Sequence, residues 1–260
     1  MDDARQVAYR VIPAYRALGE LAFAYGQGSA IAGFSERAGV DLVAVWDRAE
    51  PPEPEVRPVK ELHQGEDLPV RLHHPALGMV RDTLTNGKRQ VVVSHYTMAD
   101  VKRWVDEVQS GRGWEHVVRP TPLYAVAGLV YGAQLSDESG SGAAWRDELA
   151  AFPDALVERS RSVLSADLRA YGDDLARYAR NGDGWLFHEV FGDMLRHALV
   201  AWFASERKYC PYPKWIRHWV SRFALDPSIA ALERGMWAPP VSLERRRELF
   251  VQLAGRVLAR

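Results

Sequence analysis

The chain has 260 residues, with 33 Lys and Arg against 34 Asp and Glu, and 47% of its residues are hydrophobic. This composition is typical of one large or two smaller globular domains and excludes an extended disordered chain. Neither half of the sequence is strongly basic, which argues against a dedicated nucleic-acid-binding protein. The single cysteine, Cys210, excludes an internal disulfide framework and a cysteine-based zinc cluster. No apolar run approaches the roughly 18 residues of a membrane span, and the acidic N-terminal residues lack the pattern of a signal peptide, so we expect a cytoplasmic protein that binds no membrane.

The pattern of the first quarter of the chain predicts a helix, a short apolar run, a buried strand and a proline-rich loop. Apolar residues at helical spacing favour a helix over residues 3–20. A short apolar run follows at residues 21–25, and residues 40–46, rich in β-branched side chains, predict a buried strand. Residues 47–69 hold five prolines and seven acidic side chains, which is typical of a surface loop.

Helix and strand signals alternate in the next segment. Residues 75–84 favour a helix and residues 89–94 a strand. Thr97 and Asp100 have the spacing of a capping box that begins another helix. A further helix is expected over about residues 121–135, beginning at a Thr-Pro pair.

Residues 136–142, SDESGSG, are short, polar and flexible, and they predict a domain boundary. The sequence after them has helical periodicity interrupted by turn residues. The expected helices cover residues 143–151, 154–180, 185–208, 214–223, 228–236 and 243–259. The expected architecture is therefore α+β, with a small mixed-sheet domain over residues 1–135 followed by a helical bundle over residues 136–260.

Four segments carry a resemblance to a known family. They are residues 28–33 (GSAIAG), 39–45 (GVDLVAV), 92–96 (VVSHY) and 209–215 (YCPYPKW). In this order and with the two-domain layout, they resemble the nucleotidyltransferase-fold family, and within it the bacterial aminoglycoside and lincosamide nucleotidyltransferases. The resemblance covers most of the chain and implies the fold of that family for the N-terminal domain.

The family's signature combines a Gly-Ser turn that holds a phosphate with three carboxylates around two divalent cations. Two of these carboxylates stand one residue apart on a strand and so share a face, and the third comes from a neighbouring strand. In this sequence the three positions hold Gly39, Asp41 and Val92, and residues 89–96 contain no Asp or Glu. Because one carboxylate does not assemble a two-metal site, we expect no metal and no cofactor.

Several residues are candidates for the site by type and position. Asp41, a carboxylate in an otherwise apolar strand, is expected to act as a general base or as a structural acid paired with a cation. Glu189, in the helical domain, is the second candidate base, although a solvated helix face is the more common role of such a residue. The candidate anion- or substrate-binding residues are Gly28, Ser29, His95, Lys208 and Lys214, each of which also fits a plain structural role.

Three functions remain open. The first, which we favour, is a repurposed, metal-independent enzyme of small-molecule biosynthesis. A base would take a proton from its substrate, and a phosphate- or sulfate-like group would leave by elimination or ring closure, which makes it a lyase, cyclase or transferase. The second is a nucleotidyltransferase that modifies an antibiotic hydroxyl, with carboxylates recruited from elsewhere, such as Asp47. The third is a pseudoenzyme whose cleft binds a ligand or an unidentified partner protein.

Overall fold

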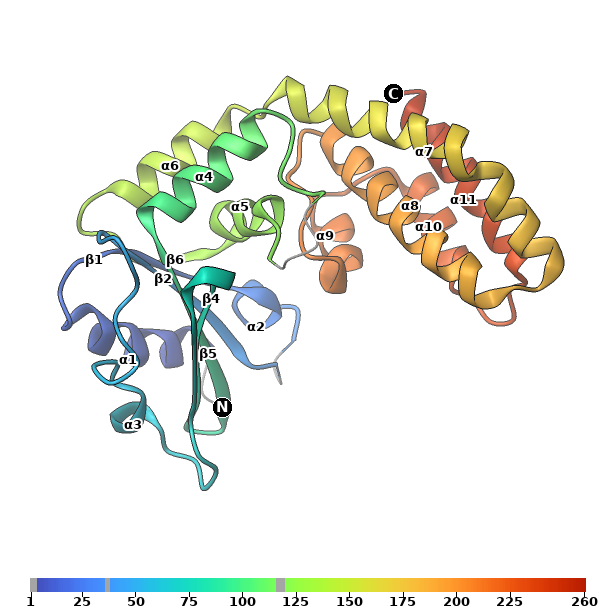
Figure 1. Cartoon of the computed structure of the whole chain (residues 1–260). Helices are drawn as coiled ribbons and strands as arrows, with labels where there is room; N and C mark the ends of the chain where they lie inside the picture. The colour runs from blue at the N-terminus through green and yellow to red at the C-terminus, as the bar shows by residue number, and fades with distance from the viewer. Residues whose placement is uncertain (1–3, 36–37, 116–119) are drawn as a thin grey trace. The chain divides into compact units, whose positions relative to one another are not determined.

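The computed structural model describes residues 4–35, 38–115 and 120–260, and the chain divides into two compact units (Figure 1). The first unit, Met1–Asp106 with Ala125–Ala151, contains the β-sheet. The second unit, Glu107–Tyr124 with Phe152–Arg260, is helical in its described part. The predicted α+β class, a mixed sheet followed by a helical region, is confirmed.

A six-stranded mixed sheet forms the first unit, with strand order β3-β4-β5-β2-β1-β6. β2 and β5 are parallel, and the other neighbouring pairs are antiparallel. The strands are β1 (Leu21–Gln27), β2 (Val40–Trp46), β3 (Val70–His74), β4 (Met79–Asn86), β5 (Arg89–Thr97) and β6 (Ala133–Ser136). The parallel pair lies in the middle of the sheet, where β2 presents Asp41.

Helices and helical turns connect these strands and extend into the second unit. They are α1 (Ala4–Arg16), α2 (Gly28–Ala32), α3 (Val59–Leu62), η1 (Pro75–Leu77), α4 (Met98–Gln109), α5 (Pro122–Tyr131) and α6 (Ser141–Ala150). The capping box predicted for α4 is confirmed, because Thr97 Oγ1 accepts the Asp100 N–H and Asp100 Oδ2 accepts the Thr97 N–H.

One face of the sheet is covered by α1, whose apolar side chains repeat at helical spacing. Its residues Val11 and Tyr15 are buried in a core that also contains Leu42 of β2 and Val93 of β5. Because side chains alternate across a strand, the even-numbered residues of β2 and the odd-numbered residues of β5 point to this face. Asp41 and its neighbours in β5 therefore point to the opposite face.

The structure differs from the sequence predictions at three places. Residues 79–84 belong to β4 and not to a helix, because pairing with both β3 and β5 outweighs the local helical pattern. The helix predicted to reach residue 135 ends at Tyr131, since β6 pairs with β1. The boundary expected at residues 136–142 lies within the first unit, where Ser139 Oγ donates a hydrogen bond to the Ala22 carbonyl.

Long helices make up the second unit, and α7 packs against α8 along most of its length (Figure 1). The elements are α7 (Asp154–Asn181), α8 (Gly184–Ser205), η2 (Pro213–Trp215), α9 (Ile216–Arg222), α10 (Pro227–Met236) and α11 (Leu243–Leu258). Gly182, with a φ of 70°, ends α7 in the left-handed conformation that glycine adopts without strain. In the interior of this unit Phe187 stacks on Phe191, and Phe250 packs against Phe191 edge to face.

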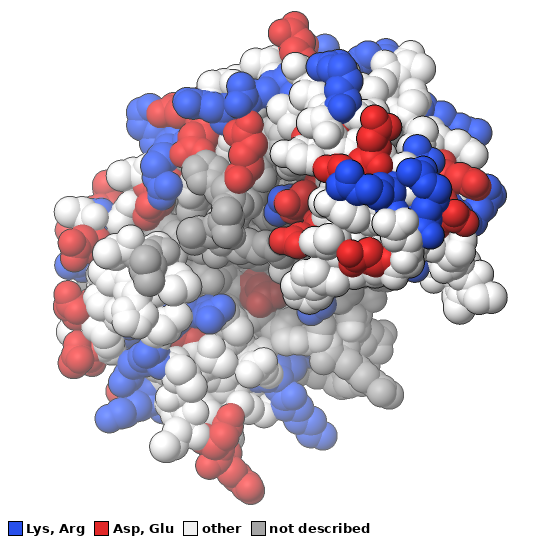
Figure 2. Space-filling view, turned by 45° about the vertical axis from the view of Figure 1, so that its right-hand side comes forward, with Lys and Arg blue, Asp and Glu red and all other residues white. Residues whose placement is uncertain are grey.

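Among the helices of the described residues, none is both long and apolar enough to span a membrane. On the face drawn in Figure 2, Lys and Arg side chains are interspersed with Asp and Glu side chains. This mixture matches the formal net charge of -1.

Candidate functional site

Asp41 lies near the start of β2, directly beside the Gly-Ser turn that begins α2. Its register partner in β1 is Gln27, and Gly28 follows that residue. Gly28 has a φ of 80°, and a Cβ built on it would lie 2.6 Å from Asp41 Oδ2. Any other residue at position 28 would both strain the backbone and displace the carboxylate. The turn and Asp41 are therefore one structural feature.

The two polar side chains of this motif differ in exposure. Asp41 is exposed, whereas Ser29 is 3% exposed. The carbonyl of Ser29 accepts the N–H groups of Phe34 and Ser35, which closes the turn after α2. A ligand can therefore reach the Asp41 side chain more easily than the Ser29 side chain.

The metal positions of the resembling family can be tested against the strand register. Asp41 and Val92 are direct partners across the parallel strands β2 and β5. Gly39 precedes β2, and a Cβ built there would lie 3.1 Å from the Gln90 carbonyl oxygen. In the described part of the chain, no group of three His, Cys, Asp or Glu side chains is placed to hold a metal ion. This donor set does not fit a pair of divalent cations, which require several carboxylate oxygens.

Polar residues of β4 and β5 extend the Asp41 face. Arg81 is the register partner of Ser94, and Thr83 is the partner of Val92. Arg81 is exposed and forms no ion pair with an acid of the described residues, whereas Thr83 and Ser94 are partly exposed. Burial raises the pKa of the nearby Tyr96 to about 12, opposed by its hydrogen bond with Ser94. The face thus combines one exposed carboxylate with one exposed guanidinium.

Sequence reasoning missed Arg81, because residues 75–84 favoured a helix and its strand face could not be assigned. Of the four residues that β4 buries, only Val80 and Leu84 are apolar, because Asp82 and Asn86 are polar, so no hydrophobic alternation marked the strand in the sequence.

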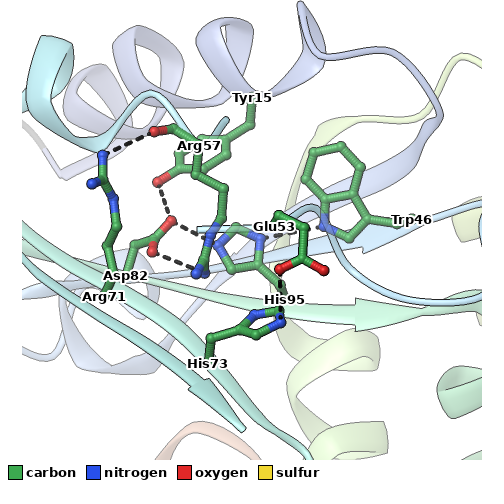
Figure 3. A network of polar contacts seen from close by, with 8 residues as sticks. All are labelled: Tyr15, Trp46, Glu53, Arg57, Arg71, His73, Asp82 and His95. Atoms are coloured by element: carbon green, nitrogen blue, oxygen red, sulfur yellow. Dashed lines mark hydrogen bonds and ion pairs between the residues drawn. The ribbon is translucent and has the colours of Figure 1, made fainter. Parts of the chain in front are cut away.

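A buried polar network occupies the α1 face, around Asp82 of β4 (Figure 3). Asp82 Oδ2 accepts hydrogen bonds from the Tyr15 hydroxyl at 2.8 Å and from His95 Nε2 at 3.0 Å. Arg57 Nη1 lies 2.9 Å from Asp82 Oδ1, an ion pair outside hydrogen-bond geometry. Both charged side chains have no exposure. Two hydrogen-bond donors and one guanidinium charge around this buried carboxylate offset its desolvation, and the ion pair fixes the loop that carries Arg57 to the sheet.

His95 belongs to this network and not to the Asp41 site. Its Nδ1 accepts a hydrogen bond from Trp46 Nε1 at 3.3 Å, and because an indole can only donate, the ring proton lies on Nε2. Burial lowers the pKa of His95, opposed by Asp82. The imidazole is 1% exposed. The His95 ring therefore faces α1 and the buried Asp82 carboxylate, on the face of the sheet opposite Asp41, and a contact between His95 and a ligand anion stays a prediction.

Glu189, Lys208 and Lys214 all belong to the second unit. Glu189 is exposed on α8. Lys208 Nζ lies 5.5 Å from the centre of the Phe223 ring, and Lys214 Nζ lies 5.0 Å from that of Trp215. These cation–π contacts provide a structural role for both lysines; substrate contacts by all three residues remain predictions.

Burial raises the pKa of the Cys210 thiol. This thiol is 2% exposed and therefore not activated as a nucleophile.

Comparisons with known proteins assign a description to part of the chain. A family model described as a domain of unknown function, DUF4037, matches residues 119–216. No curated protein matches. One similar solved structure is a nucleotidyltransferase-like protein from Exiguobacterium sibiricum 255-15, 14% identical, with a TM-score of 0.46 over 98% of this chain and 74% of that chain. A TM-score of this size does not establish a shared fold, so the fold description rests on the strand order and register given above.

Proposed function

We propose that this chain is a metal-independent enzyme of small-molecule metabolism, built on a nucleotidyltransferase-like sheet. Its substrate would carry a phosphate- or sulfate-like leaving group. The observation that carries the proposal is the single exposed carboxylate, Asp41, held beside Gly28 and opposite Val92. One carboxylate can accept a proton, but it does not supply the ligands for the cations that neutralise a triphosphate.

In the proposed reaction, the Asp41 carboxylate accepts a proton from an amine or hydroxyl of the substrate. The freed electron pair attacks the substrate carbon that bears the ester oxygen, and a ring forms. The carbon–oxygen bond breaks, and sulfate or phosphate leaves with the bonding pair. In the elimination variant the proton comes from carbon, and a carbon–carbon double bond forms instead.

Arg81 is the proposed partner of the leaving group. It is exposed on the same face of the sheet as Asp41, two strands away. A guanidinium binds tetrahedral oxyanions through two parallel N–H donors. A sulfate or phosphate monoester carries less negative charge than a triphosphate. One guanidinium therefore neutralises a larger share of the charge on a monoester. The resemblance to aminoglycoside and lincosamide nucleotidyltransferases supports a small hydroxylated or amino-bearing substrate.

The test is the release of inorganic sulfate or phosphate from a panel of monoesters of short amino alcohols and diols, measured by ion chromatography in the presence of EDTA. We expect release by the native protein to be unaffected by EDTA and Asp41→Asn to lower kcat about 100-fold. Arg81→Gln should mainly raise KM, because it removes binding of the anionic group. Lys88→Gln, an equal charge change at the exposed turn between β4 and β5, should leave both constants unchanged.

Two results would redirect the assignment. Pyrophosphate release from ATP that depends on Mg²⁺ would support nucleotidyl transfer. Substrate binding without turnover in both the native protein and Asp41→Asn would support a pseudoenzyme.

A further inference from the structure

A second Asp–His pair lies in the helical unit, between α7 and α8. His197 Nδ1 is 2.5 Å from Asp167 Oδ2. The His197 side chain is 17% exposed and that of Asp167 15%. An ionised carboxylate can only accept a hydrogen bond, so Nδ1 of the neutral imidazole carries the proton and Nε2 carries the lone pair.

Three other histidines use both of their ring nitrogens in hydrogen bonds. His95 is bonded by Trp46 and Asp82. His63 and His188 each make hydrogen bonds through both Nδ1 and Nε2 as well. His197 differs, because no residue in the described ranges hydrogen-bonds its Nε2 and its ring retains solvent exposure.

The orientation of the His197 ring is fixed from two sides. Asp167 holds Nδ1, and the Trp114 indole packs against the ring edge to face, with centroids 5.0 Å apart and an interplanar angle of 76°. Trp114 Nε1 donates to the Gly111 carbonyl, so its one polar group is engaged elsewhere. An imidazole with a carboxylate on one nitrogen and a lone pair on the other is the arrangement of a general base or nucleophile.

Asp167 is available to stabilise a charged imidazole. It forms no ion pair with a lysine or arginine of the described residues, and Arg196, adjacent to His197 in sequence, pairs with Asp193 at 2.7 Å. When Nε2 takes a proton, the positive charge on the ring lies next to an unneutralised carboxylate.

We propose that the helical unit carries a chemical site of its own, in which His197 is the proton-accepting and nucleophilic group and Asp167 is its positioning residue. The ligand is a small molecule that presents a hydroxyl or an acyl ester to Nε2. Both residues lie within the segment matched by the domain family model. The proposal is independent of the function assigned to Asp41.

The site can be probed with p-nitrophenyl acetate. The Nε2 lone pair attacks the acetyl carbon, the ester carbon–oxygen bond breaks, and p-nitrophenolate leaves with the bonding pair. Water then hydrolyses the acetylimidazole, which releases acetate and restores the neutral ring.

The experiment compares p-nitrophenolate release by the native protein and four variants. His197→Gln should slow release roughly tenfold, and Asp167→Asn should also slow it, whereas Asp167→Glu should restore part of the rate. His74→Gln, which removes an exposed imidazole from β3, should leave the rate unchanged. Imidazole ¹⁵N shifts of the native protein should show a protonated Nδ1 at His197, and Asp167→Asn should remove this tautomer preference.

A His197→Gln rate within about twofold of the native rate would overturn the proposal, as would a tautomer and rate that do not respond to Asp167→Asn. If His197→Gln fails to fold by circular dichroism, labelling of the native protein by diethyl pyrocarbonate decides the question. His197 should be modified faster than His95, whose two nitrogens are both bonded, and equal protection would contradict the proposed site.

Discussion

Asp41 and Val92 are partners across the parallel strands β2 and β5, on the sheet face opposite α1. A valine at this position offers no oxygen to a metal ion. The only carboxylate at the three positions compared with the resembling family is therefore Asp41, and it lies against Gly28. This pairing supports the proposal that residues on the Asp41 face of the sheet transfer a proton and bind an anion.

The pairing predicts that Val92→Asp creates a divalent-cation site. Two carboxylates at directly opposed positions would share one cation, so we expect Mn²⁺ affinity to rise by about tenfold or more, measured by isothermal titration calorimetry. Val93→Asp is the matched control, because Val93 is fully buried in the α1 core. That variant should lose stability without gaining affinity. Equal Mn²⁺ affinity in Val92→Asp and the native protein would show that positions 41 and 92 do not share a ligand.

Asp82 should be a major contributor to stability. Asp82→Asn leaves the buried Arg57 without its counter-ion, so the free energy of unfolding should fall by about 3–5 kcal/mol, measured by urea denaturation. Adding Arg57→Met removes the uncompensated charge and should recover part of the loss. Strictly additive losses in the double variant would mean that the two residues are not energetically coupled.

Acid should destabilise the protein through His95. Burial holds the folded-state pKa of His95 below its ordinary value of 6.5. Below pH 6.5 the unfolded chain therefore binds more protons at this residue than the folded protein does. Its contribution to stability is present above pH 6.5 and is lost as the pH falls. Urea denaturation between about pH 5 and 8 should show this decline, and a decline equally steep in His95→Gln would assign it to other groups.

Arg146 should stabilise the junction between α5 and β6. Its guanidinium donates to the carbonyls of Leu129 and Gly132 and to the side chain of Gln134. Arg146→Met keeps the apolar stem but leaves these acceptors unpaired, so we expect a loss of about 1–3 kcal/mol and faster hydrogen exchange in β6.

Arg103→Met is the control for Arg146, because it removes only an exposed ion pair with Asp100. It should change stability by less than about 1 kcal/mol. Similar losses in the two variants would argue against a specific role for Arg146.

Much of the fold could be predicted because its signals are local. β2 spans the residues whose β-branched run predicted it, and the helices of the second unit begin and end within a few residues of their turn signals. The helix predicted at residues 75–84 was wrong, because β4 is defined by its partners on both sides. Strand pairing depends on residues distant in sequence, which no local pattern encodes.

The candidate site was predictable only where a motif marked it. Gly28 and Val92 both neighbour Asp41, and these are positions that the resemblance singled out. The face of the sheet on which His95 lies depends on the strand register. A shift of the register by one residue would move its side chain to the opposite face. The Asp82 network joins α1, a loop and two strands, so sequence spacing gave no sign of it. The same holds for the pairing of Asp167 with His197 on neighbouring helices.

On the proposed function, the Asp41 face receives an oxyanion without a metal ion. The most direct measurement is a titration of the ¹⁵N-labelled protein with inorganic sulfate in EDTA, followed through backbone amide shifts. We expect saturable shifts at Gly28, Arg81 and Ser94 that disappear in Arg81→Gln and persist in Lys88→Gln. Shifts that require added Mg²⁺, or that are the same in both variants, would contradict it.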